Sequence, residues 1–275
     1  GDGTGDVIIG AFNGETATSK TNTGMAYLFN GTVSGTVSIA SADATFVGEG
    51  TNNLLGRDVA FVGDLDDDGD DELALAAPYY TPGTNTYAGR LYVVDGSSTV
   101  AGTLDADAAA STIIEGEKKN AKLGYSEFSN AVDSAGDVDG DGQDDLIVGS
   151  FGYDSAGATT ILKAGRAYLF YGDLATGTLS ASSADVIVTG NNTSEYVGYS
   201  VAGVGDVDDD GYDDIVVGAD GLSSGTGAAL LIYGGKSLAS SWSASSADAV
   251  LNGDDTGERA GRSVAAAGDT DGDGK

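Results

Sequence analysis

The sequence predicts an all-β protein, a β-propeller built from four-stranded antiparallel blades. An acidic nine-residue loop recurs at a fixed place in a long repeat, and short apolar segments stand before and after each copy. The chain has 45 Gly but only 2 Pro, which suits many turns between short strands. No segment shows a helical apolar stripe over a dozen residues. About four blades are expected.

The acidic loop sets the period of the repeat. Complete copies start at Asp64, Asp137 and Asp206, a partial copy starts at Asp269, and residues 1–6 form the back half of another. The starts are 73, 69 and 63 residues apart, a spacing that indicates a repeat architecture. We expect one propeller segment over residues 1–275. Its repeats run roughly over 1–56, 57–128, 129–199 and 200–262, with the start of the next at 263–275.

Each repeat is predicted to hold four strands, because its apolar segments are short, rich in β-branched and aromatic residues, and bounded by Gly, Asn, Asp or Ser. The first strand leads into the acidic loop, at 59–63, 131–136, 201–205 and 264–268. The second follows the loop, at 7–12, 73–78, 146–151 and 215–220. The third lies at 24–31, 89–96, 165–172 and 227–234. The fourth lies at 44–50, 111–117, 185–191 and 249–254.

The composition excludes several kinds of chemistry. The chain has no Cys and no His, which removes disulfides, thiol nucleophiles, imidazole bases and zinc sites of the usual kind. With 43 acidic and 12 basic residues the net charge is −31, so we expect no nucleic-acid partner. No apolar run reaches the length of a membrane span, so we expect no membrane insertion in this segment.

The acidic loop has the spacing of a cation site. Counted from the first Asp, carboxylates occupy positions 1, 3, 5 and 9, and position 6 is always Gly. Calcium takes six to eight oxygens in irregular geometry, including a backbone carbonyl, here expected at position 7. Magnesium demands a tighter octahedron, so Ca²⁺ is the predicted cofactor. The predicted ligands are Asp64, Asp66, Asp68, Asp70, Glu72; Asp137, Asp139, Asp141, Gln143, Asp145; Asp206, Asp208, Asp210, Tyr212, Asp214; and, from the partial loops, Asp2, Thr4, Asp6, Asp269, Asp271, Asp273.

Two other readings of the loop are open to argument. An EF-hand needs a Glu at position 12 and flanking helices, but position 12 is Leu75, Val148 or Val217, inside an apolar segment. An acidic turn that only keeps a sheet edge soluble is the second reading. The loop at 64–72 holds seven acids in nine residues, which repel one another unless they are neutralised. The repeated spacing therefore favours a cation.

The flanks of the loops carry a familiar pair of motifs. Gly56, Gly198 and Gly261 stand eight residues before a loop, whereas the remaining copy reads FSNAV, with Ser129 in place of Gly. After the loops stand GAF (10–12), AAP (76–78), GSF (149–151) and GAD (218–220). The order of these motifs, over the whole chain, resembles the FG-GAP repeats of integrin α-subunit β-propellers and their bacterial relatives. No copy matches the pattern perfectly.

The resemblance implies calcium in the hairpin between the first two strands of a blade, and extracellular adhesion or recognition. Family members usually have seven blades, so we expect this chain to be part of a larger propeller. The alternative is a compact four-blade ring, in which residues 263–269 lie beside the strands of residues 7–50. Because the sequence starts at Gly1 and not at Met, the lack of a signal peptide in it is no evidence against secretion.

A second surface is predicted opposite the acidic loops. The connections between second and third strands, and between fourth and first strands of successive blades, share that face. Exposed aromatic side chains on variable loops suit recognition of a protein or glycan ligand. The alternative is that the rings pack between blades and the lysines balance nearby acids. The residues concerned are Tyr79, Tyr80, Tyr87, Tyr125, Tyr153, Tyr196, Tyr199, Lys118, Lys119 and Lys122.

The favoured function is a calcium-binding extracellular propeller in adhesion or ligand recognition, with Ca²⁺ in a structural role. A lectin-like carbohydrate module and a non-catalytic propeller domain of a secreted polysaccharide-active enzyme are the alternatives. Some enzymes cleave glycosidic bonds with a pair of Asp or Glu residues. Here nearly all clustered acids fit the metal loops, so we do not expect an enzyme.

Overall fold

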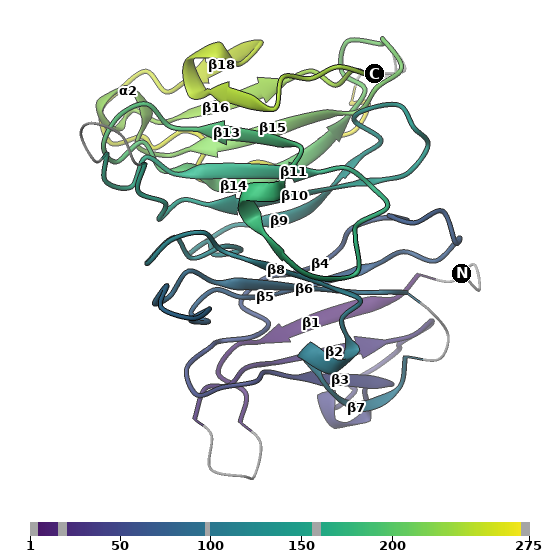
Figure 1. The fold of residues 1–275 in the computed structure, drawn as a ribbon. Coiled ribbons are helices and arrows are strands. Elements are labelled where there is room, and N and C mark those ends of the chain that lie inside the picture. Colours follow the sequence, from purple (N-terminus) through teal and green to yellow (C-terminus); the bar gives the residue numbers. More distant parts are fainter. Residues whose placement is uncertain (1–4, 16–20, 97–99, 156–160, 271–275) are drawn as a thin grey trace.

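The protein is a stack of four β-sheets (Figure 1). The computed structural model describes residues 5–15, 21–96, 100–155 and 161–270. Within them the helices are single short turns, α1 (Ala106–Ala109), α2 (Leu222–Gly225), η1 (Ile39–Ser41), η2 (Ala181–Ser183) and η3 (Ala244–Ser246). None is long and apolar enough to cross a membrane. The all-β prediction is confirmed.

The antiparallel strands of each sheet come from one repeat. The first holds β1 (Val7–Ala11), β2 (Met25–Phe29) and β3 (Ala44–Val47). The second holds β4 (Val59–Phe61), β5 (Leu73–Ala77), β6 (Arg90–Val94) and β8 (Thr112–Glu115). The third holds β9 (Val132–Gly136), β10 (Asp145–Ser150), β11 (Arg166–Phe170) and β13 (Val186–Thr189). The fourth holds β14 (Val197–Gly205), β15 (Asp214–Ala219), β16 (Ala228–Ile232) and β18 (Ala249–Asn252). These strands pair in sequence order and antiparallel.

Three short strands were not predicted. They are β7 (Gly102–Asp105), β12 (Gly177–Ser180) and β17 (Ser241–Ser243). Each leaves the third-to-fourth strand connection of its own repeat and pairs in parallel with the fourth strand of the preceding sheet, β3, β8 or β13. Four-stranded antiparallel blades are therefore an incomplete description, because a repeat also adds a short parallel strand to the sheet of the preceding repeat. Their sequences, GTLD, GTLS and SWS, are too short and polar to show a strand pattern.

The predicted strand at 264–268 is absent. These residues form no regular structure, and in the described part of the chain no strand pairing joins residues 263–269 to residues 7–50. A strand needs a neighbour to satisfy its backbone groups, and no strand of the described residues pairs with 264–268. The first sheet is incomplete in the complementary way, since β1 pairs only with β2 among the described residues.

The third repeat keeps its glycine, contrary to the reading that Ser129 replaces it. Gly124, with φ of +69°, donates its backbone N–H to the carbonyl of Gly149. Gly56, with φ of +74°, makes the same bond to the carbonyl of Ala76. The glycine therefore lies five residues further upstream than the alignment of the loops suggests, and residues 125–129 form an insertion before β9.

The core lies between neighbouring sheets. One cluster joins Ile114 of the second sheet to Leu146 and Tyr168 of the third, and another joins Leu169 of the third to Val201 of the fourth. All are buried, with at most 2% of their surface exposed. Each sheet is thus stabilised mainly by its neighbours, as in repeat proteins generally.

Candidate metal centre

Each complete acidic loop closes a hairpin between the first and second strands of a sheet. In the first of them, Val62 N–H donates to the Glu72 carbonyl at 2.9 Å, and Glu72 N–H donates to the Gly63 carbonyl at 2.8 Å. The other two loops join β9 to β10 and β14 to β15. The flanking elements are strands, which separates these loops from an EF-hand. We call the surface that carries the three loops the hairpin face.

The carboxylate at position 1 organises the bend of each loop. Asp64 accepts the backbone N–H groups of Asp68 at 3.1 Å and Gly69 at 2.9 Å. Asp137 and Asp206 accept the same two N–H groups within their own loops. Position 6 has φ between +92° and +99° in all three loops, a conformation that favours glycine. The recurrent Gly at position 6 is thus explained by geometry.

The loops bring three carboxylates together in each case. The groups are Asp64, Asp66, Glu72; Asp137, Asp139, Asp141; and Asp206, Asp208, Asp210. In each group one oxygen from every residue lies within 4.8 Å of the others. An oxygen-only donor set with no ammonium or guanidinium group among its members suits a hard divalent cation. The residues present therefore fit a divalent cation of this kind.

Several predicted ligands stand apart from these groups. Asp68, Asp145 and Asp214 do not belong to the close clusters of their loops. Of the partial loops, Asp6 is described and accepts the Gly31 N–H at 2.6 Å. Asp269 lies at the end of the described residues. Asp2, Thr4, Asp271 and Asp273 lie outside them.

The acid at position 9 ties the loop to the end of the third strand. Asp145 is fully buried and accepts the N–H groups of Val138 and Gly172, both at 2.9 Å. Glu72 and Asp214 make the equivalent pairs of bonds. Burial raises the pKa of Glu72 and of Asp145 to about 7, although the N–H donors oppose it. Position 9 therefore has a structural role that does not require a cation.

The charges of neighbouring acids affect the pKa of the acids at position 3. The pKa of Asp66 and that of Asp139 are raised, first by desolvation and then by the charge of the acid two residues later. Position 5 supplies that charge in both loops. Crowded carboxylates of this kind become easier to ionise when a cation lies between them.

The sequence prediction missed the acid at position 8. Asp144 accepts the N–H of Asp64 at 3.0 Å and donates its own N–H to the Asp64 carbonyl at 3.0 Å. Asp213 makes the same two contacts with Asp137. The second and third loops are thereby fastened to the first residue of the preceding loop. The recurrence of an acid at position 8, in Asp71, Asp144 and Asp213, was a signal available in the sequence.

The opposite surface, which we call the connection face, carries the predicted aromatic residues. Tyr79 contacts the rings of Tyr87 and Tyr125 edge to face, with centroids 5.4 and 5.8 Å apart. The series continues from Tyr125 through Phe151 to Tyr196 and Tyr199. Tyr153 and Tyr199 are buried, at 2% and 5% exposure, whereas Tyr87 is 43% exposed. Packing between blades therefore explains part of the set but not Tyr87.

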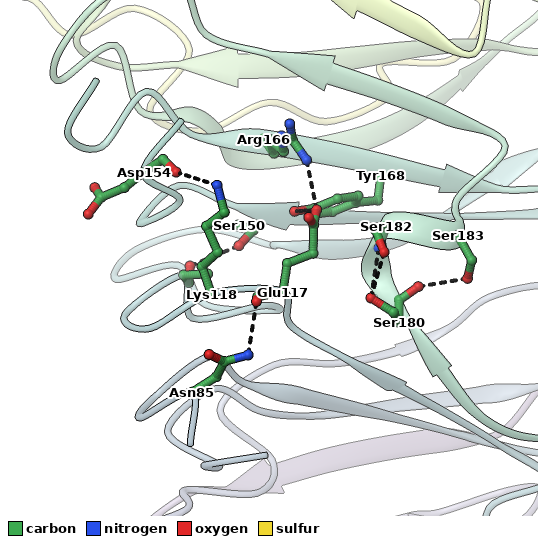
Figure 2. A network of polar contacts seen from close by, with 11 residues as sticks. Asn85, Glu117, Lys118, Ser150, Asp154, Arg166, Tyr168, Ser180, Ser182 and Ser183 are labelled. Carbon is green, nitrogen blue, oxygen red and sulfur yellow. Dashed lines mark hydrogen bonds and ion pairs between the residues drawn. The ribbon is translucent and has the colours of Figure 1, made fainter. Parts of the chain in front are cut away.

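The cations of the connection face contact rings and carboxylates. The Lys122 ammonium lies 4.8 Å from the Tyr79 ring centre and 4.9 Å from that of Tyr125. Lys118 lies over the Tyr153 ring, and its Nζ donates to the Asp154 carbonyl (Figure 2). The exposed Lys119 is the third member of the predicted lysine group. Lys118 and Lys122 are thus held by aromatic rings more than by nearby acids.

A partly buried ion pair connects two sheets on this face. Figure 2 shows Glu117 between Arg166 and Tyr168, with Glu117 Oε1 2.7 Å from Arg166 Nη1 and 2.8 Å from the Tyr168 hydroxyl. The Arg166 guanidinium also stacks 3.9 Å from the Tyr153 ring centre. In the second repeat Arg90 makes the same kind of contacts with Glu115, Glu49 and the Tyr80 ring.

Comparison with known proteins identifies the repeats. The FG-GAP repeat family matches residues 55–94, 129–170 and 197–232. The chain carries three FG-GAP repeats, which in integrin α subunits are β-propeller blades, so the resemblance noted in the sequence is confirmed.

The relatives are much longer than this chain. Integrin alpha-V of Gallus gallus is 39% identical over 102 residues, which cover 37% of the chain and 9% of that protein. Integrin alpha-6 of Gallus gallus is 31% identical over 182 residues, covering 65% and 15% respectively. Phosphatidylinositol-glycan-specific phospholipase D of Bos taurus is 30% identical over 182 residues, covering 64% and 20%. The chain thus spans at most a fifth of any of these three proteins.

Proposed function

We propose that the three complete loops each bind one Ca²⁺ ion and that these ions stabilise the propeller blades. The observation that carries the proposal is a close group of three carboxylates in each complete loop, formed by positions 1 and 3 together with position 9 in the first loop and position 5 in the other two. Positions 1, 3, 5 and 9 supply carboxylates and position 7 supplies its carbonyl. A cation at each loop offsets repulsion that the backbone N–H donors oppose only in part.

We further propose that the protein acts outside the cytosol, in adhesion or ligand recognition. The integrin relatives support an adhesion or ligand-binding propeller at the level of the family. Extracellular calcium modules bind at about 0.1 to 1 mM, so weak sites of this kind would be filled outside cells. A protein or glycan ligand would bind at the connection face, where aromatic side chains gather away from the acidic loops.

The proposed role is not catalytic. The similarity to a phospholipase D covers a fifth of that enzyme. In the described part of the chain, the carboxylates that lie close together in threes belong to the hairpin loops. Calcium in such loops is held by the protein alone and needs no substrate, which suits a structural ion.

Calorimetry with two matched variants tests the calcium proposal. Asp66→Asn and Asp67→Asn remove the same charge from adjacent residues, but only Asp66 belongs to a carboxylate group. Asn tolerates the positive φ of Asp67. The unmodified chain should bind about three Ca²⁺ ions. Asp66→Asn should lose one of them, and Asp67→Asn should keep all.

The controls separate a site from general attraction to an acidic surface. Magnesium and sodium at matched ionic strength should displace little of the bound calcium. Absence of calcium binding at millimolar concentration and low ionic strength, or equal losses in Asp66→Asn and Asp67→Asn, would contradict the proposal.

A further inference from the structure

The backbone of the first loop is held by the repeat that follows it. The Asp144 N–H donates to the Asp64 carbonyl at 3.0 Å, and Asp144 Oδ2 accepts the Asp64 N–H at 3.0 Å. The Asp173 N–H donates to the Leu65 carbonyl at 2.6 Å. The Leu65 N–H has its partner in the same loop, the carboxylate of Glu72. Three of the four backbone groups of Asp64 and Leu65 are therefore bound by the third sheet, although both residues belong to the hairpin of the second.

The backbone of the second loop is held in the same way. The Asp213 N–H donates to the Asp137 carbonyl at 3.0 Å, and Asp213 Oδ2 accepts the Asp137 N–H at 2.9 Å. The Gly235 N–H donates to the Val138 carbonyl at 2.7 Å. The Val138 N–H bonds to Asp145 of its own loop. The arrangement is therefore a feature of the repeat and not of one pair of sheets.

The residue before each of these two loops leaves room for the contact. Gly63 and Gly136 have φ of +82° and +73°, a conformation that favours glycine. A Cβ atom at Gly63 would lie 2.0 Å from Asp144 Oδ2, and one at Gly136 would lie 2.1 Å from Asp213 Oδ2. Any side chain there would displace the carboxylate at position 8. The glycine that ends the apolar segment before these loops is therefore explained by the carboxylate of the following repeat.

The contacts at position 8 connect two groups of proposed calcium ligands. Asp64 belongs to the carboxylate group of the first loop, and Asp137 belongs to that of the second. Asp144 lies in the second loop, next to Asp145, whose carboxylate fixes the end of that loop. An ion in the second loop would hold residues 137–145 in one arrangement, and would thereby hold Asp144 against the backbone of Asp64.

We propose that Asp144 and Asp213 are positioning residues that couple neighbouring calcium sites, so that an ion in one loop raises the affinity of the adjacent loop. This inference rests on the proposed function, because it requires that the loops bind calcium. Coupling between two binding sites is reciprocal, so it acts in both directions along the stack. Cations in neighbouring loops repel each other, so a favourable coupling comes from the contacts that join the loops.

The order of the sheets provides a direct test by calcium calorimetry on the full chain. Asp139→Asn disables the second loop and leaves the first and third, which share no position 8 contact among the described residues. Asp66→Asn disables the first loop and leaves the second and third, which Asp213 joins. Each variant should bind two Ca²⁺ ions. In Asp66→Asn the second ion should bind roughly 5-fold or more tightly than the first. In Asp139→Asn the two ions should bind independently.

Substitutions at position 8 test the positioning residues themselves. They are made in a chain whose third loop is disabled by Asp208→Asn, so that the pair of sites joined by Asp144 remains. Asp144→Ala removes the acceptor of the Asp64 N–H, so two ions should still bind but independently. Asp144→Asn keeps an acceptor oxygen and should restore the coupling. Asp71→Ala is the matched control, because this acid occupies position 8 of the first loop, is exposed, and makes no side-chain hydrogen bond with the described residues.

The outcomes separate the coupling from the calcium proposal. Three ions that bind independently to the unmodified chain, or equal coupling in Asp139→Asn and Asp66→Asn, would overturn the coupling and leave the calcium sites in place. A chain that binds no calcium would overturn both. If position 8 only fastened the sheets, Asp144→Ala would lower the melting temperature and leave the coupling unchanged, and the proposal would be wrong. Should Asp144→Ala fail to fold, the comparison of Asp139→Asn with Asp66→Asn decides.

Discussion

The carboxylates on the two faces of the stack have different kinds of partners. On the connection face, cations and anions occur together, as in the Arg166–Glu117 pair and the Arg90 cluster. Nine of the ten Lys and Arg residues in the described ranges lie on or next to the connections of that face. On the hairpin face, close carboxylates have backbone N–H donors as partners.

The difference shows which face has a stability that depends on the ions in solution. Ion pairs that the chain itself supplies are present under any condition in which it folds. Carboxylates that have only N–H donors retain a net negative charge, and their free energy varies with the cations in solution. We therefore expect the hairpin face to respond to calcium and chelator, and the connection face to respond to neither.

Removing calcium is the largest expected perturbation. Each site held at a calcium concentration of 100 Kd stabilises the native state by about 2.7 kcal/mol, so three sites contribute roughly 8 kcal/mol. Thermal unfolding in calcium and in EDTA should differ strongly, and limited proteolysis should cleave the chelated form much faster. Equal resistance to protease in both conditions would remove the distinction between the faces.

Asp145→Ala should reveal the structural role that position 9 has in addition to its proposed role as a metal ligand. The substitution leaves the buried N–H groups of Val138 and Gly172 without an acceptor, at a cost of about 2 to 4 kcal/mol. Chemical unfolding in EDTA should reveal this loss. Asp139→Ala is the matched comparison, and it should lose stability in calcium only. Similar behaviour of the two variants in EDTA would show that position 9 has no structural role apart from the cation.

Asp58→Asn should change the pH dependence of stability without involving calcium. Burial raises the pKa of Asp58 to about 6, from an ordinary value of 3.8. Between these values the folded state binds the proton and the unfolded state does not, so stability falls as pH rises from about 4 to about 6. The loss is at most about 3 kcal/mol. Asp58→Asn should abolish this part of the slope in EDTA, as measured by urea unfolding at several pH values.

Tyr168→Phe should have the smallest effect of the four. It removes one hydrogen bond to Glu117 and leaves the Arg166 pair in place, so about 1 kcal/mol should be lost. The loss should be the same in calcium and in EDTA. A loss that appeared only in one of them would show that the connection face also senses the ion.

Much of the fold was predictable because its signals are local. The strands flanking the acidic loops, such as β5 and β10, are apolar, short and bounded by turn residues, and the structure has them close to the predicted bounds. The added strands β7, β12 and β17 were not predictable in this way. They exist because a neighbouring sheet offers an edge, which is a tertiary effect that propensity does not carry.

The contacts of the candidate site were likewise predictable where they are local and not where they depend on how the sheets stack. The spacing of Asp137, Asp139 and Asp141 predicted that they would meet, and the structure brings them together. The contacts of Asp144 with the preceding loop depend on how two sheets stack, so only the recurrence of that acid was visible in advance. The shift from Ser129 to Gly124 was missed because the loops were aligned without allowing for an insertion.

The insertion at residues 125–129 gives the array something that repetition cannot provide. Identical repeats present the same surface, so a ligand that binds one repeat binds every repeat equally well. The extra residues occur in one repeat and carry Phe128, whose side chain is 66% exposed, beside the guanidinium of Arg262. They make one place on the connection face different from the corresponding places of the other repeats. A ligand that contacted these residues would bind in one orientation and in a ratio of one per chain.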